Sequence, residues 1–216
     1  MSRPERKLQK RFIVFCEGDA EFNYINKMRK NQDVHISLKP INMHGGGYMN
    51  FLNKIKTESQ TNCLAKFIIV DADRLKKHHK EKESFNKLVE YCRLQNKKGT
   101  APHFLIVNNP DFEYAACLHV PEYKGQDVNG FIKGVLGFDS VEHFKKHDDV
   151  YECLNRDRRS YKVLVNNIRG KDKFVKNTYS VKKSKLEISI RRTDVKWELL
   201  SSKGSNMEEF YDVIEW

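Results

Sequence analysis

Short apolar runs recur through the first half of the chain. Three of them, at 11–16, 66–70 and 104–107, are built from strand-forming residues with hardly a polar interruption. A further segment, 34–41, alternates apolar and polar positions, as a strand with one exposed face does. Unbroken runs of this length are typical of strands that are covered on both faces, and such strands usually run parallel.

Segments with helical periodicity separate the predicted strands. Apolar residues recur three and four positions apart after the first strand, after the glycine triplet 45–47 and before the last strand. The residues that show this spacing are Phe22, Ile25, Met28, Tyr48, Phe51, Leu52, Ile55, Phe85, Leu88, Val89 and Cys92. Strands that alternate with helices form βαβ units. The sequence therefore predicts an α/β fold with a parallel sheet flanked by helices.

The pattern weakens beyond about residue 120, where a proline and several glycines interrupt it. Helices are still expected within 140–153 and 158–168, and a strand is expected within 186–200. We therefore divide the chain into an α/β core at 10–120 and a C-terminal region at 121–216 that packs on this core.

Positive charge is concentrated in the second half of the chain. The sequence has 40 Lys and Arg against 29 Asp and Glu, which gives a formal net charge of +11. Residues 151–192 hold thirteen of the basic and four of the acidic residues, a net charge of +9. The C-terminal region is therefore a basic extension, and a polyanion is an expected partner.

Aromatic residues are interleaved with these basic residues, at Tyr151, Tyr161, Phe174 and Tyr179. Lys and Arg neutralise a phosphate backbone and aromatic rings stack on bases, so the stretch is compatible with a nucleic-acid surface. It is equally compatible with an ordinary solvated basic face. The candidate nucleic-acid-binding residues are Arg158, Arg159, Lys162, Lys171, Lys173, Lys176, Lys182 and Lys183.

The sequence also argues against some classes of protein. No apolar run approaches the roughly 20 residues of a membrane span, and the basic opening segment does not resemble a secretory signal. The five cysteines include no C-x-x-C pair, which argues against structural zinc and fits a reducing compartment. We therefore expect a cytoplasmic protein with no membrane partner.

Acidic residues follow two of the predicted strands. Asp71 and Asp73 come directly after 66–70, and Glu17 follows 11–16. The carboxyl ends of parallel strands meet at one edge of a sheet, so these three carboxylates are expected to converge. Carboxylate oxygens are the ligands that Mg²⁺ and Mn²⁺ prefer, although a lone D-x-D is more often a solvated strand end.

Two further acidic residues are expected at the same edge. Glu21 lies one turn beyond Glu17 and faces the same crevice, but the helix dipole alone also favours an acidic residue there. Glu113 follows the Asn109-Pro110 turn and is placed in the first turn of another helix. It contacts either the substrate or the helix end. His119 has apolar neighbours and is expected to be a core histidine.

Two sets of residues resemble a known family. The order 16–21 (CEGDAE), 45–47 (GGG) and 71–73 (DAD) resembles the Toprim domain, which has a Glu-Gly turn after its first strand and a later D-x-D. More narrowly, 108–119 (NNPDFEYAACLH) is similar to the S-N-P-x-F-E-x-W-x-L-L-H segment of RloB-like proteins. These are small Toprim proteins encoded beside restriction and abortive-infection genes. The resemblance covers roughly 10–120.

The sequence departs from the family pattern at three places. Ala20 stands where many members have Thr, Asn108 replaces Ser, and the expected Trp is missing from 114–116. The chain beyond residue 150 does not match the family, so the resemblance does not identify the substrate.

The resemblance implies a Toprim-like Rossmannoid sheet and a divalent-metal-dependent nuclease. Glu17, Asp71 and Asp73 would hold Mg²⁺ or Mn²⁺, and Glu21 would be a ligand of a second ion. From its expected place on the crevice side of its helix, we add Glu113 to the candidate catalytic residues. The substrate would be DNA or RNA, with tRNA among the candidates, and the role would be antiviral defence or abortive infection. An ATPase encoded nearby is an implied partner.

Two other functions remain compatible with these residues. One is a small Toprim ribosomal-RNA maturase, which would have a similar length and charge. The other is a nonenzymatic subunit that binds nucleic acid and an ATPase and holds Mg²⁺ only for its structure.

Overall fold

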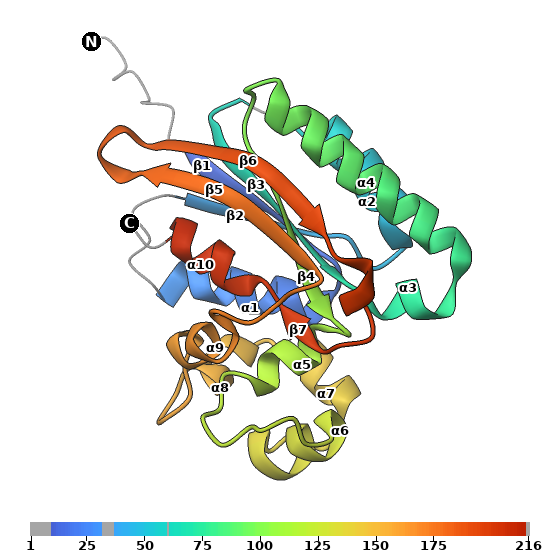
Figure 1. The fold of residues 1–216 in the computed structure, drawn as a ribbon. Coiled ribbons are helices and arrows are strands. Elements are labelled where there is room, and N and C mark those ends of the chain that lie inside the picture. The colour runs from blue at the N-terminus through green and yellow to red at the C-terminus, as the bar shows by residue number, and fades with distance from the viewer. Residues whose placement is uncertain (1–9, 32–36, 60, 215–216) are drawn as a thin grey trace, which may run out of the picture.

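A computed structural model describes residues 10–31, 37–59 and 61–214 of the 216-residue chain. It shows an α/β fold in which helices cover both faces of a five-stranded sheet (Figure 1). The strand order is β2-β1-β3-β4-β7. The predicted fold class is confirmed at this level.

Four strands of the sheet are parallel and correspond to the predicted runs. They are β1 (Arg11–Cys16), β2 (Ser37–Asn42), β3 (Cys63–Asp71) and β4 (His103–Asn109). The fifth, β7 (Gly204–Ser205), runs antiparallel to the end of β4, so the sheet is mixed rather than wholly parallel. The first part of the predicted strand 34–41 lies outside the described residues.

Alternation along the central strands produces two apolar cores. In β1, Phe12 and Val14 face one core and Ile13 and Phe15 face the other, and all four are fully buried. The first core lies under α1 (Asp19–Asn31) and α10 (Met207–Ile214). The second lies under α2 (Gly47–Thr57) and α4 (His79–Lys97) on the opposite face (Figure 1). Burial on both faces explains why these strands are continuously apolar.

Short helices gather around the carboxyl ends of the parallel strands, in the lower part of Figure 1. Two of them, at 141–146 and 161–168, fall within the helical segments predicted from the sequence, and a third, at 150–154, overlaps the predicted segment 140–153. The helices of this group are α3 (Asp73–Lys77), α5 (Phe112–Cys117), α6 (Val128–Phe131), a π-helical turn (Ile132–Leu136), α7 (Val141–Lys146), α8 (Val150–Leu154) and α9 (Tyr161–Ile168).

A long antiparallel hairpin lies beside β4. It consists of β5 (Val175–Lys182) and β6 (Glu187–Val195), joined by a 3₁₀ turn (Lys183–Lys185) and followed by a second one (Trp197–Leu199). The predicted strand within 186–200 is β6, whereas β5, β7 and α10 were not predicted.

Side-chain amides occupy the edge of β4 before β7 begins. The Asn206 Oδ1 accepts a hydrogen bond from the Val107 amide at 2.7 Å, and its Nδ2 donates to the Leu105 carbonyl at 3.0 Å. Asn177 Nδ2 donates to the same carbonyl at 2.9 Å. These contacts satisfy backbone groups that an edge strand would otherwise leave unpaired. The region beyond residue 120 therefore completes the sheet as well as covering it.

Candidate functional site

A cavity of about 340 Å³ lies at the carboxyl ends of the parallel strands. Eight carboxylate side chains and three cationic side chains line it, together with backbone of the first turn of α1 and of the glycine triplet. We call it the carboxylate cavity. Its charged residues are Glu17, Asp19, Glu21, Asp71, Asp73, Asp111, Glu113, Glu142, Arg74, Lys145 and Lys146. All five predicted catalytic residues therefore lie in one cavity.

Glu17 joins the ends of two neighbouring strands. It directly follows β1, and its Oε2 accepts a hydrogen bond from the backbone amide of Asp71 at 2.8 Å. The Asp71 carbonyl in turn accepts a hydrogen bond from the Tyr48 hydroxyl at 2.5 Å. One oxygen of Glu17 thus has a structural role, and the strand ends are held in register by side chains.

Asp71 and Asp73 reach the cavity by different local structures. Asp71 is the last residue of β3, but the backbone of Ala72 is helical and Asp73 begins α3. The two carboxylates therefore do not project from one extended strand. Asp73 Oδ2 accepts a hydrogen bond from Lys77 at 2.9 Å, whereas Asp71 Oδ1 is buried without a hydrogen-bond partner.

The backbone around Asp71 is fixed by the turn that follows β4. The Ala72 amide donates to the carbonyls of Asn108 and Pro110, both at 2.9 Å. Asn109 anchors the same turn, because its Nδ2 donates to three carbonyls between β6 and β7, among them that of Ser202 at 2.6 Å. The predicted turn at Asn109 is present, and Asn109 itself has a structural role.

Glu21 and Glu113 are held in the first turns of two helices. Glu21 Oε2 accepts a hydrogen bond from the Gly18 amide at 3.2 Å. In α5, the Asp111 side chain caps the helix by accepting the Tyr114 amide at 3.0 Å. Glu113 Oε1 lies 3.7 Å from Lys145 Nζ of α7. Both glutamates are almost fully buried.

The glycine triplet forms the loop expected next to this site. Gly45, Gly46 and Gly47 all have positive φ, a conformation that L side chains rarely adopt. A Cβ at Gly47 would lie 2.7 Å from Glu81 Oε1, the end of a flexible side chain that would have to move. The Gly45 amide donates to the Glu17 carbonyl at 2.8 Å, which ties the loop to the site.

Burial and mutual repulsion raise the pKa values of the carboxyl groups in the cavity. Burial, with repulsion from Glu113 and Glu17, raises the pKa of Glu21 to about 8. Burial raises the pKa of Glu113 to about 7, although Lys145 opposes the shift. The pKa of Asp71 is raised well above its ordinary value by burial and by Glu21 and Glu17. The same causes, with Asp73 as the neighbour, raise the pKa of Glu17.

The side chains of the cavity are of the types that bind a divalent cation, but they are not arranged around a single ion position. Carboxylate oxygens suit Mg²⁺ and Mn²⁺, and the unpartnered Asp71 Oδ1 is a free ligand atom. Among the described residues, however, no three Asp, Glu, His or Cys side chains are arranged to hold one ion together. Glu17 and Glu21 each use one oxygen to accept a backbone amide. Side chains would have to rotate to complete a coordination shell.

The sequence did not identify the cations of the cavity. Arg74 follows Asp73 in α3, and Lys145 and Lys146 lie in α7, more than 70 residues further along the chain. Lys145 is half-buried, and burial opposes the raised pKa that Glu113 and Glu142 give its ammonium. Nothing in the local sequence distinguishes Lys145 from other surface lysines, because its role depends on where α7 packs.

The predicted nucleic-acid-binding residues do not form one surface. Lys162, Lys171 and Lys176 are exposed, as is Arg158, which pairs with Glu122 at 3.4 Å. The other four residues have different surroundings, and Lys173 needs correction because it is buried. Arg159 is held by the carbonyls of Val135 and Cys153, and Lys173 is buried in an ion pair with Glu208 at 2.5 Å. Lys182 and Lys183 lie at the hairpin turn, at the far end of the molecule from the carboxylate cavity (Figure 1).

The aromatic residues of the same stretch belong to the core. The Tyr151 ring lies 5.2 Å from that of Tyr24, and Tyr161 stacks on Tyr211 at 4.9 Å. Phe174 and Tyr179 pack on Phe85 and Phe104, with ring centroids 5.6 and 5.3 Å apart. Tyr151 and Phe174 are buried, so their rings are not accessible to a base, whereas Tyr161 and Tyr179 are half-buried.

His119 is the core histidine expected from its neighbours. It is fully buried, and its Nε2 lies 2.9 Å from the Tyr24 hydroxyl. Burial lowers its pKa to about 4, so the imidazole is neutral at physiological pH.

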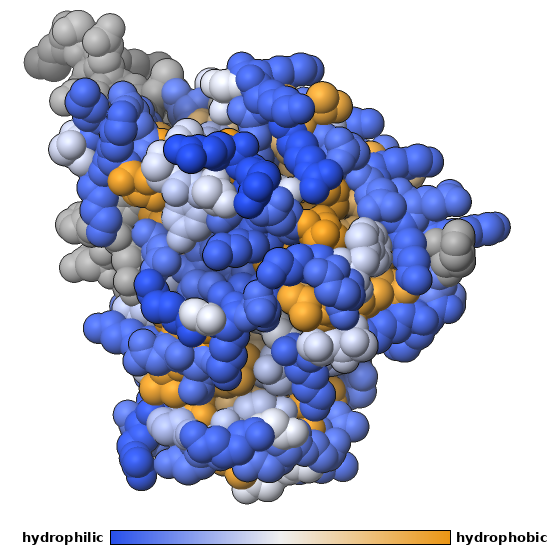
Figure 2. Space-filling model, viewed as in Figure 1, coloured by the Kyte–Doolittle hydropathy of each residue, from blue (hydrophilic) through white to orange (hydrophobic). Residues whose placement is uncertain are grey.

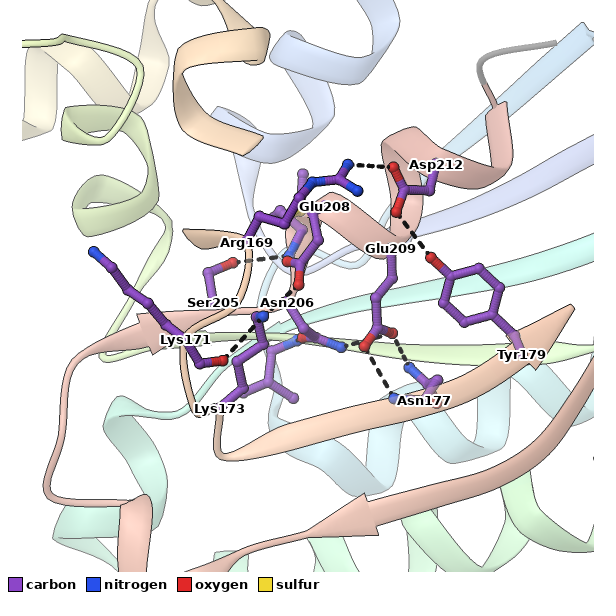
Figure 3. Close-up of polar contacts among 12 residues, drawn as sticks. Arg169, Lys171, Lys173, Asn177, Tyr179, Ser205, Asn206, Glu208, Glu209 and Asp212 are labelled. Carbon is purple, nitrogen blue, oxygen red and sulfur yellow. Dashed lines mark hydrogen bonds and ion pairs between the residues drawn. The ribbon is translucent and has the colours of Figure 1, made fainter. Parts of the chain in front are cut away.

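A second polar cluster lies where α10 begins (Figure 3). Glu209 accepts hydrogen bonds from Asn177 and Asn206, and Lys173 and Glu208 form their buried ion pair beside it. A cavity of about 280 Å³ opens over this cluster. Its exposed cations include Lys171, Lys176 and Lys196.

Comparisons with known proteins identify no relative of this chain: no family model, no curated protein and no solved structure matches it. Within the part of the chain that the structure describes, no helix is both long enough and apolar enough to cross a membrane.

Proposed function

We propose that the protein is a divalent-metal-dependent nuclease and that the carboxylate cavity is its active site. The observation that carries the proposal is the convergence of eight carboxylates, at the carboxyl ends of parallel strands, around an unpartnered oxygen of Asp71. Such clustering raises the pKa of the carboxyl groups and is unfavourable unless a cation neutralises it. The Toprim-like order of Glu17, Asp71 and Asp73 in the sequence supports the same conclusion.

Each group of the cavity has a role in this proposal. Glu17, Asp71 and Asp73 would hold Mg²⁺ or Mn²⁺, and Glu21 would serve a second ion. When bound, the cation supplies positive charge against the phosphate and lowers the pKa of a water molecule. Glu113, whose pKa lies at about 7, is suited to take up or release a proton at its carboxylate near neutral pH.

Three cations make the cavity accessible to a phosphodiester. Arg74, Lys145 and Lys146 share the lining with the carboxylates and reduce their net negative charge. Lys145 is paired with Glu113, whose Oε1 lies 3.7 Å from its ammonium. Because the Lys145 ammonium is already held in the cavity, it would contact a phosphate oxygen without a large movement of its side chain.

The resemblance to RloB-like proteins supports a more specific biological role. It suggests a cytoplasmic defence or abortive-infection nuclease that works with an ATPase encoded nearby.

The nuclease proposal is tested by incubating the purified protein with plasmid DNA, total tRNA and ribosomal RNA, in Mn²⁺, in Mg²⁺ and in EDTA. We expect cleavage of at least one substrate that requires the divalent ion. Asp71→Asn should reduce the rate by at least about 100-fold, since it removes a charged ligand. Asp139→Asn is the matched control, because Asp139 is 94% exposed and lies outside the cavity.

Each outcome separates the proposal from its alternatives. Cleavage that persists in EDTA or in the Asp71→Asn variant would contradict the assignment of the site. Cleavage confined to one position in ribosomal RNA would identify a maturase. Nucleic-acid binding without any cleavage would favour the nonenzymatic subunit.

A further inference from the structure

Four lysines on neighbouring segments form a candidate route to the carboxylate cavity. Lys176 and Lys171 lie at the start of β5 and in the loop before it, Lys196 follows β6, and Lys203 precedes β7. All four are exposed. These elements meet in the centre of Figure 1, and Figure 2 shows that this face is largely hydrophilic.

Contacts between the elements make the route continuous. Lys196 Nζ pairs with Asp172 at 2.8 Å, next to Lys171. A Cβ built on Gly204 would lie 3.9 Å from the Asp172 carbonyl, so the loop that carries Lys203 adjoins the same segment. The backbone segments that carry Lys171, Lys196 and Lys203 therefore lie next to one another.

Tyr114 connects this basic surface to the carboxylate cavity. The Lys203 ammonium lies 5.8 Å from the centre of the Tyr114 ring. Tyr114 belongs to the first turn of α5, and its amide is bonded to the side chain of Asp111, which lines the cavity. The half-buried Tyr114 ring, which also lies 6.1 Å from the Tyr123 ring in an edge-on arrangement, thus adjoins Lys203, and its backbone adjoins a residue of the cavity.

Most of the charge on this route is not neutralised within the protein. Lys171, Lys176 and Lys203 form no ion pair within 4.0 Å among the described residues, whereas Lys173 and Lys196 have acidic partners. The hairpin turn also carries exposed lysines, but it lies at the far end of the molecule from the cavity. Of the unpaired lysines, Lys203 lies beside Tyr114, and Lys171 and Lys176 line the cavity over the cluster at the start of α10.

We infer that a single strand of nucleic acid reaches the carboxylate cavity over Lys171, Lys176 and Lys203, with Tyr114 as the ring on which a base stacks. This inference rests on the proposed function, since it describes how the substrate enters the same site. Lysines neutralise phosphates along the strand, and the accessible part of an aromatic ring can stack on any base. A duplex keeps its bases stacked inside and offers none to Tyr114.

The test measures binding of fluorescein-labelled single-stranded DNA and RNA in EDTA by fluorescence anisotropy, so that no cleavage is needed. We expect the double variant Lys171→Glu and Lys203→Glu to weaken binding at least about 10-fold. The slope of log affinity against log salt should also fall in magnitude by roughly 1.4, because two phosphate contacts are lost. The matched control is Lys182→Glu with Lys185→Glu, which makes the same charge change at the hairpin turn and should weaken binding less than about twofold.

The role of Tyr114 is tested separately. Tyr114→Ala should weaken binding about 5- to 100-fold, whereas Tyr114→Phe should bind as the wild type does, because stacking needs only the ring. The thermal unfolding midpoint of each variant shows whether the fold is intact. If Tyr114→Ala unfolds, the lysine variants still decide the route.

The possible outcomes distinguish this inference from the proposed function. Equal losses in the two double variants, or no binding of either nucleic acid, would overturn the inference. The affinity for nucleic acid could fall only in the variants of Lys171, Lys203 and Tyr114 while the wild type cleaves nothing in Mn²⁺. This result would support the route and contradict the nuclease proposal. Cleavage that all these variants perform at wild-type rates would support the nuclease and overturn the route.

Discussion

At the scale of single residues, Asp71 couples the charge of the cavity to the stability of the fold. Its buried Oδ1 has no hydrogen-bond partner, and Glu21 and Glu17 repel its charged form. Because its pKa is raised in the folded state, the ionised form destabilises the protein as the pH rises. A divalent cation would reverse this effect by binding the folded state.

We therefore expect Asp71→Asn to have opposite effects with and without metal. In EDTA at mildly alkaline pH the variant should melt at the same temperature as the wild type or a few degrees higher, since repulsion is relieved. Mn²⁺ should raise the midpoint of the wild type but not that of the variant. Differential scanning fluorimetry measures both effects. Equal shifts by Mn²⁺ in the two proteins would place the ion elsewhere.

At the scale of secondary-structure elements, local sequence predicted the strands and helices whose surroundings are uniform. β1, β3 and β4 are covered on both faces, so their apolar runs are unbroken and stand out in the sequence. β5 was missed because its positions alternate between the core and solvent, and the solvent positions are mostly basic or hydroxylic. β7 has two residues and depends on pairing with β4.

For the candidate site too, local sequence predicted only some of the residues. Glu17 and Asp71 were predicted to converge because the ends of parallel strands have a fixed relation to one another. Lys145 was missed, since its place in the cavity follows from how α7 packs. Lys173 was wrongly assigned to the surface, because its partner Glu208 lies 35 positions away in α10. Contacts that are distant in sequence leave no local pattern.

The edge of β4 provides a prediction for one element. Asn206→Ala removes the acceptor of the Val107 amide and one of the donors to the Leu105 carbonyl, and both groups are buried. We expect a loss of about 2–4 kcal/mol in the free energy of unfolding, measured by urea denaturation. Ser202→Ala, at an exposed position in the preceding loop, should cost less than about 0.5 kcal/mol. A similar small loss for Asn206→Ala would mean that water replaces the amide.

At the scale of the whole molecule, the second half of the chain is part of the α/β fold. Phe210 of α10 packs edge-on against Phe67 of β3, with ring centroids 4.9 Å apart. Tyr211 donates or accepts a hydrogen bond at 2.6 Å with Tyr24 of α1. The two halves therefore share a core, and the buried polar groups of both contribute to the free energy of unfolding of the whole molecule.

These buried groups make the stability of the whole molecule depend on pH. Burial raises the pKa of Glu21 to about 8 and those of Glu113 and Glu209 to about 7. The folded chain therefore binds more protons than the unfolded chain between about pH 4.5 and pH 8, and stability falls as the pH rises through that window. Burial lowers the pKa of His103 and His119 to about 4. Below about pH 6.5 these two histidines therefore make the stability rise as the pH rises.

We therefore expect the free energy of unfolding in EDTA to fall between about pH 6.5 and pH 8, where the carboxyl groups titrate and the histidines do not. Urea denaturation should show a fall on the order of 1 kcal/mol for each of the three glutamates. Glu209→Gln should reduce this slope, and Asp139→Asn, at a 94% exposed position, should leave it unchanged. Mn²⁺ should remove the part of this fall that Glu21 and Glu113 cause and leave the part that Glu209 causes. Stability that rises over this interval in EDTA would contradict the raised pKa values.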